Sequence, residues 1–171
     1  MTDAQSSLGA RAMELRQAFD RAFADEARAD MAPKDDLLAI RVGGEPYALR
    51  LSEIAGLFAD KPVTRIPSRA SGIIGIGGFR GAIVPVYSLA AVIGRPQPET
   101  QRWIVIAAAM PVALAFDTFD GHLRVPRDAI MPRQGDGRKR NYVHHVARAA
   151  DGVRPIVHLP AVLDAIGTPA S

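Results

Sequence analysis

The chain has no cysteine among its 171 residues, which excludes disulfide bonds, thiolate catalysis and cysteine-ligated zinc or iron–sulfur sites. No apolar run approaches the roughly 20 residues of a membrane-spanning helix, and residues 1–5 lack the basic and then apolar pattern of a secretion signal. The net charge of +3 is too small to call for a nucleic-acid partner by itself. We therefore expect a cytoplasmic protein without direct membrane insertion.

What is present is a globular composition. Apolar residues make up 48% of the chain and charged residues 23%, close to the averages of folded domains. A chain of this length has room for one ordinary domain, or for two small barrels that share a core.

The first part of the chain predicts one amphipathic helix. Between residues 6 and 31, apolar residues recur at helical spacing with charges between them: Leu8, Ala12, Leu15, Ala18, Phe19, Ala22 and Phe23. Pro33 then ends the pattern. We interpret residues 1–33 as a helical extension, whose apolar stripe either packs on the body of the protein or receives a partner.

From residue 34 to residue 168 the period changes to two, as in β-strands. Residues 38–51 read as a β-hairpin with Gly43 and Gly44 in its turn. Short apolar runs broken by glycine and proline follow, a pattern typical of small all-β barrels. Brief helices are expected at residues 52–57, 89–93 and 159–166.

Two sets of matching residues indicate an internal duplication. Residues 46–49 (Pro-Tyr-Ala-Leu) are echoed 65 positions later at 111–114 (Pro-Val-Ala-Leu). Pro85, Leu89, Ala91 and Val92 recur 70 positions later as Pro155, Leu159, Ala161 and Val162. The matches predict two similar sub-barrels, roughly residues 34–95 and 96–168, each with a hairpin, a helical turn and a glycine-turn, strand and helix unit.

The most distinctive stretch combines Val-Thr-Arg-Ile-Pro at residues 63–67 with Gly-Ile-Ile-Gly-Ile-Gly-Gly-Phe-Arg-Gly-Ala-Ile-Val-Pro-Val at 72–86. It resembles the central motif of CheW-like domains, in which V-T-x-[IV]-P leads to I-x-G-[VI]-x-N-[LI]-R-G-x-I-V-P-[VI]. The agreement extends across most of residues 37–166, including Asp-Gly-Val-Arg-Pro-Ile-Val-His-Leu at 151–159.

The residues of this motif also have a direct physical interpretation. Gly81 can supply the positive φ of a tight hairpin turn, which leaves Arg80 raised at the rim between two apolar strands. The apolar run at residues 83–86 predicts a strand buried on both faces. Pro85 within it requires an edge or crossover position, because proline donates no ladder hydrogen bond.

The resemblance implies a mainly β fold of two intertwined SH3-like five-stranded barrels with short helices, sharing a core. It implies a non-enzymatic adaptor that needs no cofactor and couples methyl-accepting chemotaxis receptors to a CheA-type histidine kinase. One barrel of the family docks on the regulatory domain of the kinase, and the groove between the barrels meets the receptor tip. We expect Arg80, Gly81, Phe79 and Ile54 at or near such contacts, with Phe79 and Ile54 alternatively in the core.

The chain departs from the family pattern at four positions. Gly78 replaces the usual asparagine before the Leu-Arg-Gly triplet, and Ser88 and Ala90 replace an aspartate and an arginine after the Ile-Val-Pro strand. Gly56 replaces an acidic residue. Because some of these positions face partners in the family, the choice of partner stays open.

No motif for catalysis, nucleotide binding or metal binding competes with this interpretation. The glycines at residues 75–81 lack the G-x-G-x-x-G order and the Gly-Lys-Ser/Thr ending of phosphate loops. His144 and His145 are adjacent and would point to opposite faces of a strand, while His122 and His158 have no partner at helical spacing. No serine, histidine and aspartate show an activating context such as a nucleophile elbow, so we do not expect an enzyme.

Two other functions remain open. The basic run at residues 133–140 reads as a loop between strands, or as a groove of a small barrel that binds single-stranded nucleic acid, with only Tyr142 nearby to stack on a base. The other alternative is a CheW-like adaptor for a kinase pathway outside chemotaxis. We expect no nucleic-acid partner.

Overall fold

The structure is a computed structural model that describes residues 11, 13–22, 24, 32–68, 70, 72–133 and 142–167. Its contacts divide the chain into two compact units, Met1–Lys34 and Asp35–Ser171. In the first unit, the described residues between 11 and 24 are helical, within the window predicted from the apolar spacing. The assignment of residues 1–33 as an extension stays a prediction.

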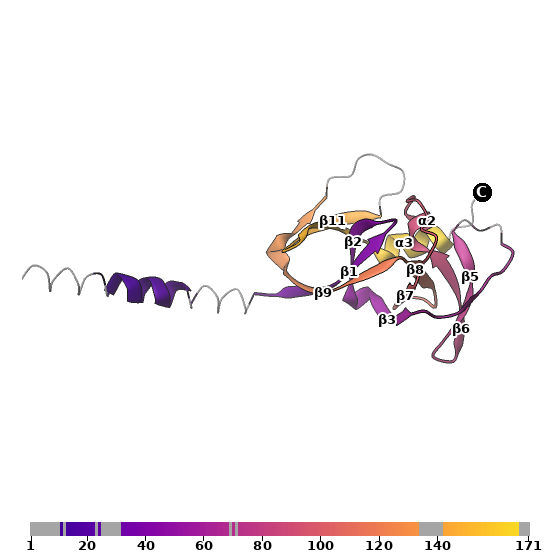
Figure 1. Cartoon of the computed structure of the whole chain (residues 1–171), viewed down its shortest axis with the longest axis horizontal. Coiled ribbons are helices and arrows are strands. Elements are labelled where there is room, and N and C mark those ends of the chain that lie inside the picture. Colours follow the sequence, from indigo (N-terminus) through magenta and orange to yellow (C-terminus); the bar gives the residue numbers. More distant parts are fainter. Residues whose placement is uncertain are drawn as a thin grey trace, which may run out of the picture. The chain divides into compact units, whose positions relative to one another are not determined.

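The second unit is mainly β, as predicted, and contains two sheets of six strands where five were expected (Figure 1). The first sheet has the order β10 (Ile130–Pro132), β11 (Val143–Ala149), β12 (Gly152–Val157), β2 (Glu45–Arg50), β1 (Lys34–Val42) and β9 (Thr118–Pro126). The second has the order β3 (Ile54–Ala59), β7 (Trp103–Ala107), β8 (Ala113–Phe116), β6 (Ala82–Ser88), β5 (Ile73–Phe79) and β4 (Val63–Thr64).

The strand pairing repeats with the two offsets found in the sequence. In the first sheet β12 runs parallel to β2, with Ile156 opposite Ala48. In the second, β6 runs parallel to β8, with Val86 opposite Ala113. The predicted offset of 65 carries Ala48 to Ala113, and the offset of 70 carries Val86 to Ile156. The two parallel pairs are therefore the same contact, made once in each sheet.

The two repeats exchange hairpins. The β1–β2 hairpin, from the first half of the sequence, joins β9 to β12, whereas the β7–β8 hairpin, from the second half, joins β3 to β6. The boundary near residue 95 stays a prediction; each sheet takes strands from both sides of that position. The sheets are intertwined in this sense.

The short helices agree with the sequence at two of three places. Helix α2 (Leu89–Val92) and helix α3 (Leu159–Gly167) lie where brief helices were predicted. The helix expected at residues 52–57 is wrong: a single 3-10 turn, η1 (Leu51–Glu53), leads directly into β3. A second 3-10 turn, η2 (Arg127–Ala129), precedes β10. Pairing of β3 with β7 overrides the helical spacing of those few residues.

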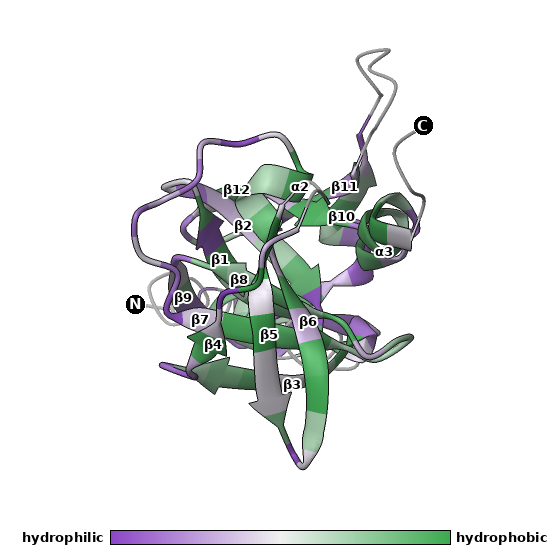
Figure 2. Ribbon diagram, turned by 90° about the vertical axis from the view of Figure 1, so that its right-hand side faces the viewer, coloured by the Kyte–Doolittle hydropathy of each residue, from purple (hydrophilic) through white to green (hydrophobic). Residues whose placement is uncertain are grey.

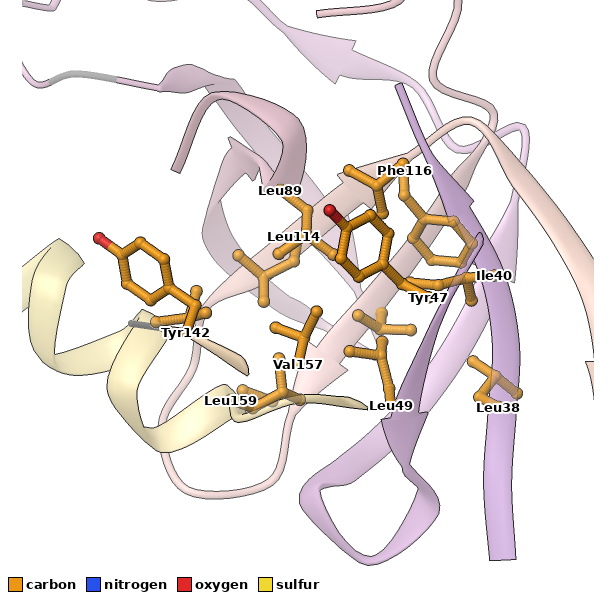
Figure 3. Close-up of a cluster of buried hydrophobic side chains, with 14 of the residues drawn as sticks. Leu38, Ile40, Tyr47, Leu49, Leu89, Leu114, Phe116, Tyr142, Val157 and Leu159 are labelled. Carbon is orange, nitrogen blue, oxygen red and sulfur yellow. The ribbon is translucent and has the colours of Figure 1, made fainter. Parts of the chain in front are cut away.

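One apolar cluster contains residues of both sheets and of helices α2 and α3. Figure 3 shows Tyr47 and Leu49 of the first sheet gathered with Leu114 and Phe116 of the second and with Leu159 of α3. At roughly 25 cal/mol per Å² of apolar area, burial of this kind is the main favourable contribution to folding. Both sheets contribute to this cluster because each exchanged hairpin places side chains in it.

One buried cation, Arg154 of β12, connects several strands of the first sheet. Arg154 is 3% exposed, and its guanidinium contacts the carboxylates of Asp120 and Asp151. It also donates hydrogen bonds to the main-chain carbonyls of Ile40 and Tyr47, at 3.3 and 3.4 Å. Because nearly all of its donors have acceptors, the charge is tolerated inside the fold.

The strand β6 corrects one prediction and agrees with another. Residues 83–86 are not buried on both faces: Ile83 is 77% exposed, whereas Val84 and Val86 are buried. Pairing of β6 with β8 begins only at Val86, so residues 82–85 of β6 have β5 as their paired neighbour. Val84 in this half still packs in a core cluster, whereas Ile83 is exposed. Pro85 lies in that half, the edge position that its missing N–H requires.

Candidate functional site

The β5–β6 hairpin carries the candidate contact residues. Phe79 pairs with Ala82, so Arg80 and Gly81 form a two-residue turn. Their φ angles are 47° and 84°, as type I′ hairpin turns require at both central positions. The positive φ predicted for Gly81 is confirmed. Figure 2 shows the hairpin projecting beyond β3, with hydrophobic residues along much of β6.

The Arg80 side chain lies against an aromatic ring of the neighbouring strand β3. Its guanidinium carbon is 5.8 Å from the centre of the Phe58 ring, and the ammonium nitrogen of Lys61 is 5.7 Å from the same centre. Phe58 in turn packs on Phe79, with ring centres 5.2 Å apart. Two cations therefore flank one half-exposed ring whose other neighbour belongs to the core.

A small apolar pocket opens beside Arg80. Its volume is about 150 Å³, and its lining comes from β3, β5, β6 and the β7–β8 hairpin: Ala55, Phe58, Phe79, Arg80, Ala82, Val84, Ile106 and Pro111. The pairing of β3 with β7 shifts register between Ile54 and Gly56, so a β-bulge lies at its edge. Bulges often re-aim side chains next to functional sites.

The structure places three of the four predicted contact residues on this hairpin. Arg80 and Gly81 are exposed at the turn, whereas Phe79 is only 4% exposed and faces the pocket from the core side. Ile54 begins β3 and packs, half-buried, against the main core cluster. Contact with a partner stays a prediction for all four residues.

Sequence reasoning missed Phe58 and Lys61 as members of this site. They lie about 20 positions before Arg80 in the sequence, and only the arrangement of β3 beside the hairpin brings them together. Residues 54–59 (Ile-Ala-Gly-Leu-Phe-Ala) show no alternation of apolar and polar residues, so the sequence carried no clear strand signal there. The helix predicted at residues 52–57 covered part of the same segment.

The four departures from the family pattern fall into two groups. Ser88 and Ala90 are buried, and the Ser88 hydroxyl accepts a hydrogen bond from the Ala91 N–H at the start of α2. These two replacements are internal. Gly56 and Gly78 lie beside the hairpin surface: a Cβ at Gly56 would lie 3.5 Å from Arg80 Nη2, and a Cβ at Gly78 would meet nothing within 4 Å.

The histidines do not form a metal site in the described part of the chain. The rings of His144 and His158 stack with centres 4.5 Å apart, a contact that the sequence did not reveal. Burial lowers the pKa of His145, and the nearby cation Arg50 lowers it further. Among the described residues, no group of three or more metal-ligating side chains occurs.

The proposed nucleic-acid groove loses its stacking residue. Tyr142 is 8% exposed and packs in the main core, so its ring is not available to a base. Residues 134–140 of the basic run lie outside the described residues. In the part of the chain that the structure describes, no helix has the length and hydrophobicity to span a bilayer.

The fold and this surface define a mainly β protein with two strand-exchanged sheets and an exposed cation beside an apolar pocket. The family model of the CheW-like domain matches residues 36–167. The chain belongs to this family.

Relatives with assigned names support the same placement. The probable chemotaxis protein CheW of Rhizobium etli is 28% identical over 101 residues, which cover 57% of this chain and 65% of the relative. Protein FrzA of Myxococcus xanthus is 26% identical over 117 residues, which cover 66% of this chain and 71% of the relative. The match thus spans slightly less than two thirds of the Rhizobium protein.

A solved structure shows the same fold. The scaffolding protein TtCheW from Thermoanaerobacter tengcongensis superposes with a TM-score of 0.64 at 21% identity. The match covers 73% of this chain and 89% of the other. The resemblance inferred from the central motif is therefore confirmed, both in family and in fold.

Proposed function

We propose that this protein is a non-enzymatic cytoplasmic adaptor that couples methyl-accepting chemotaxis receptors to a CheA-type histidine kinase. The observation that carries the proposal is the Arg80 hairpin, a raised cation beside an apolar pocket in a chain of the CheW-like family. Membership in that family supports the role of adaptor, and its partners are the regulatory domain of the kinase and the receptor tip.

Arg80 has the chemistry of an interface anchor. A guanidinium offers five donors in a planar fork that fits carboxylates or main-chain carbonyls of a partner. Anchors of this kind combine a charged or aromatic side chain with an apolar pocket that excludes water. Arg80, Phe58 and the pocket provide these parts within one surface.

The test is the variant Arg80→Ala. We expect its affinity for a partner to fall about 30-fold, which corresponds to about 2 kcal/mol at an interface hot spot. Binding is measured by calorimetry with the kinase regulatory domain and, separately, with a receptor signalling tip. Folding changes little, because shortening an exposed side chain leaves no cavity, and circular dichroism checks this. Unchanged affinity for both partners in a folded variant would contradict the role given to Arg80.

An adaptor of this family could also serve a kinase pathway outside chemotaxis. One relative, FrzA, has a name that does not mention chemotaxis. Binding to a kinase regulatory domain but to no methyl-accepting receptor tip favours this second candidate. The nucleic-acid alternative has lost its stacking residue, Tyr142. A salt-dependent gel shift of labelled single strands at low ionic strength is the result that would restore it.

A further inference from the structure

We propose that the surface around Arg80 binds a partner segment in which a bulky apolar side chain lies next to a carboxylate. The proposal rests on the adaptor function, since it specifies the chemistry of the partner at the same surface. It follows from the charge of the surface, the size of the pocket and the backbone of the turn.

The first argument is unbalanced charge. Arg80 and Lys61 flank one aromatic ring, and neither forms an ion pair with any residue that the structure describes. A nearby arginine behaves differently: Arg102 donates two hydrogen bonds to Asp60, at 2.9 and 2.7 Å. The Arg80 surface is thus a cationic spot without an internal counter-ion, which favours an acidic partner.

The position next to Arg80 extends this argument. Gly56 lies beneath the guanidinium, where a Cβ would be 3.5 Å from Nη2. An acidic side chain at this position could reach Arg80, and glycine cannot supply one. The Phe58 ring occupies the adjoining space, since its Cε2 would lie 2.9 Å from such a Cβ. Strand β3 therefore offers Arg80 a ring and no carboxylate, which leaves the counter-charge to a partner.

The size of the pocket indicates the second feature of the partner segment, its bulky apolar side chain. Sites for small molecules enclose about 300–1,000 Å³, whereas this pocket has a volume of about 150 Å³. It accommodates one apolar side chain rather than a free ligand. Ile83, 77% exposed on the same hairpin, adds apolar surface for the rest of a docked segment.

The backbone of the turn supplies a third argument. Arg80 has a φ of 47°, a left-handed conformation that glycine and asparagine adopt at lower cost. A turn selected for stability alone would carry one of those residues. The arginine at this position therefore points to a use for its guanidinium, because strained residues cluster at functional sites.

The experiment uses the full-length chain and a display library of short random peptides. Peptides are selected on the parent protein and then counter-selected against the double variant Lys61→Gln/Arg80→Gln. We expect the retained peptides to carry Asp or Glu adjacent to Leu, Ile, Met or Phe. Their affinity falls about 10-fold with Arg80→Gln, equivalent to 1.4 kcal/mol. It weakens as salt concentration rises.

Three controls make the result specific. Arg102→Gln removes an exposed arginine that already has a carboxylate, and it should leave peptide affinity unchanged. Arg80→Glu should abolish binding of the acidic peptide and restore it for the same peptide with its acid changed to lysine. Thermal unfolding of each variant shows whether the fold is intact.

The outcomes separate this proposal from the adaptor function. Retained peptides without an acidic residue, or a library that yields no peptide dependent on Arg80, overturn the proposal even where both signalling partners bind. Acidic and apolar peptides that bind through Arg80 uphold the proposal. If such peptides bind but neither the kinase domain nor the receptor tip binds the chain, the docking chemistry stands and the assigned partners are wrong.

Discussion

Arg80 combines an unfavourable backbone conformation with a favourable position for binding. For residues other than glycine, the left-handed region costs roughly 1–2 kcal/mol, and asparagine tolerates it better than arginine. The next residue, Gly81, meets its own requirement for positive φ without strain. An asparagine at position 80 would therefore stabilise the turn, but it would remove the guanidinium.

We predict that Arg80→Asn raises the free energy of unfolding by about 0.5–1 kcal/mol, because Asn-Gly is the preferred type I′ pair. The same change lowers affinity for the partner, since the donors of the guanidinium are lost. Chemical denaturation measures the first effect and calorimetry the second. Arg80→Ala is the matched control, because it removes the charge without the preference of asparagine for positive φ. A variant that is both less stable and weaker in binding would contradict this trade-off.

The sequence predicted some members of the site and not others, for a physical reason. Arg80 and Gly81 were found because the properties of a hairpin turn depend on adjacent residues, and adjacency is visible in a sequence. Phe58 and Lys61 contact Arg80 only through the packing of β3 against the hairpin. Tyr142 reads in the sequence as a ring beside a basic loop, but its burial depends on the whole core.

The strands β4 and β5 approach each other so closely that one glycine determines their contact. A Cβ built on Gly75 would lie 2.1 Å from the carbonyl oxygen of Thr64 and 3.0 Å from the Cα of Arg65. Both atoms belong to the backbone, which cannot turn away as a side chain can. Glycine at this position is therefore a condition of the close approach of β4 to β5.

We expect Gly75→Ala to destabilise the fold by on the order of 2 kcal/mol, because the new methyl group forces β4 away from β5. Gly78→Ala is the matched control: it lies in the same strand, and its Cβ meets nothing within 4 Å. The control should be neutral or slightly stabilising, since alanine restricts the unfolded chain more than glycine does. Urea denaturation compares the two, and equal stabilities would show that β4 can shift at little cost.

The strands themselves were largely predictable, and their partners were not. Alternation of apolar residues predicted the β1–β2 hairpin, and the structure places Gly43 and Gly44 in its turn, between the paired residues Val42 and Glu45. The prediction that residues 83–86 are buried on both faces was wrong, because a continuous apolar sequence looks the same whether it is buried or projects into solvent. Exposure of Ile83 depends on where β8 begins, because β8 runs parallel to β6 and pairs with it only from Val86 onward.

The exchange of hairpins makes the two sheets one folding unit. The β1–β2 hairpin completes a sheet built mainly from the second repeat, so neither repeat can form its sheet without the other. The carboxylates at the start of β1 strengthen this connection. Asp35 contacts Arg50 of β2 and Arg127 of η2, and Asp36 contacts His122 of β9 at 2.9 Å. The body of the fold therefore depends on the chain from the beginning of β1 onward.

We predict that deletion of residues 1–33 leaves a cooperatively folded protein, because it stops short of β1 and keeps Asp35 and Asp36. Scanning calorimetry should show one transition close to that of the full chain. Deletion of residues 1–36 is the matched comparison, since it removes both carboxylates, and we expect a clearly lower midpoint. Loss of the transition or of solubility in the shorter deletion would place the apolar stripe of Leu15 and Phe19 in the core.

The stability of the two deletion variants should also differ in its dependence on acid pH. Burial raises the pKa of Asp35, but hydrogen bonds from Arg127 and Arg50 outweigh it and hold the pKa below its usual value. A carboxylate of this kind stabilises the fold at any pH above its unfolded pKa of about 3.9, and the contribution is lost as pH falls through the lower folded value. The deletion of 1–33 should therefore keep the acid sensitivity of the full chain below about pH 4. The deletion of 1–36 should lose part of this acid sensitivity, because the carboxylate that would be protonated is absent. Stability measured against pH checks this for the two proteins. If both lose the same stability between neutral pH and acid, Asp35 does not have this role.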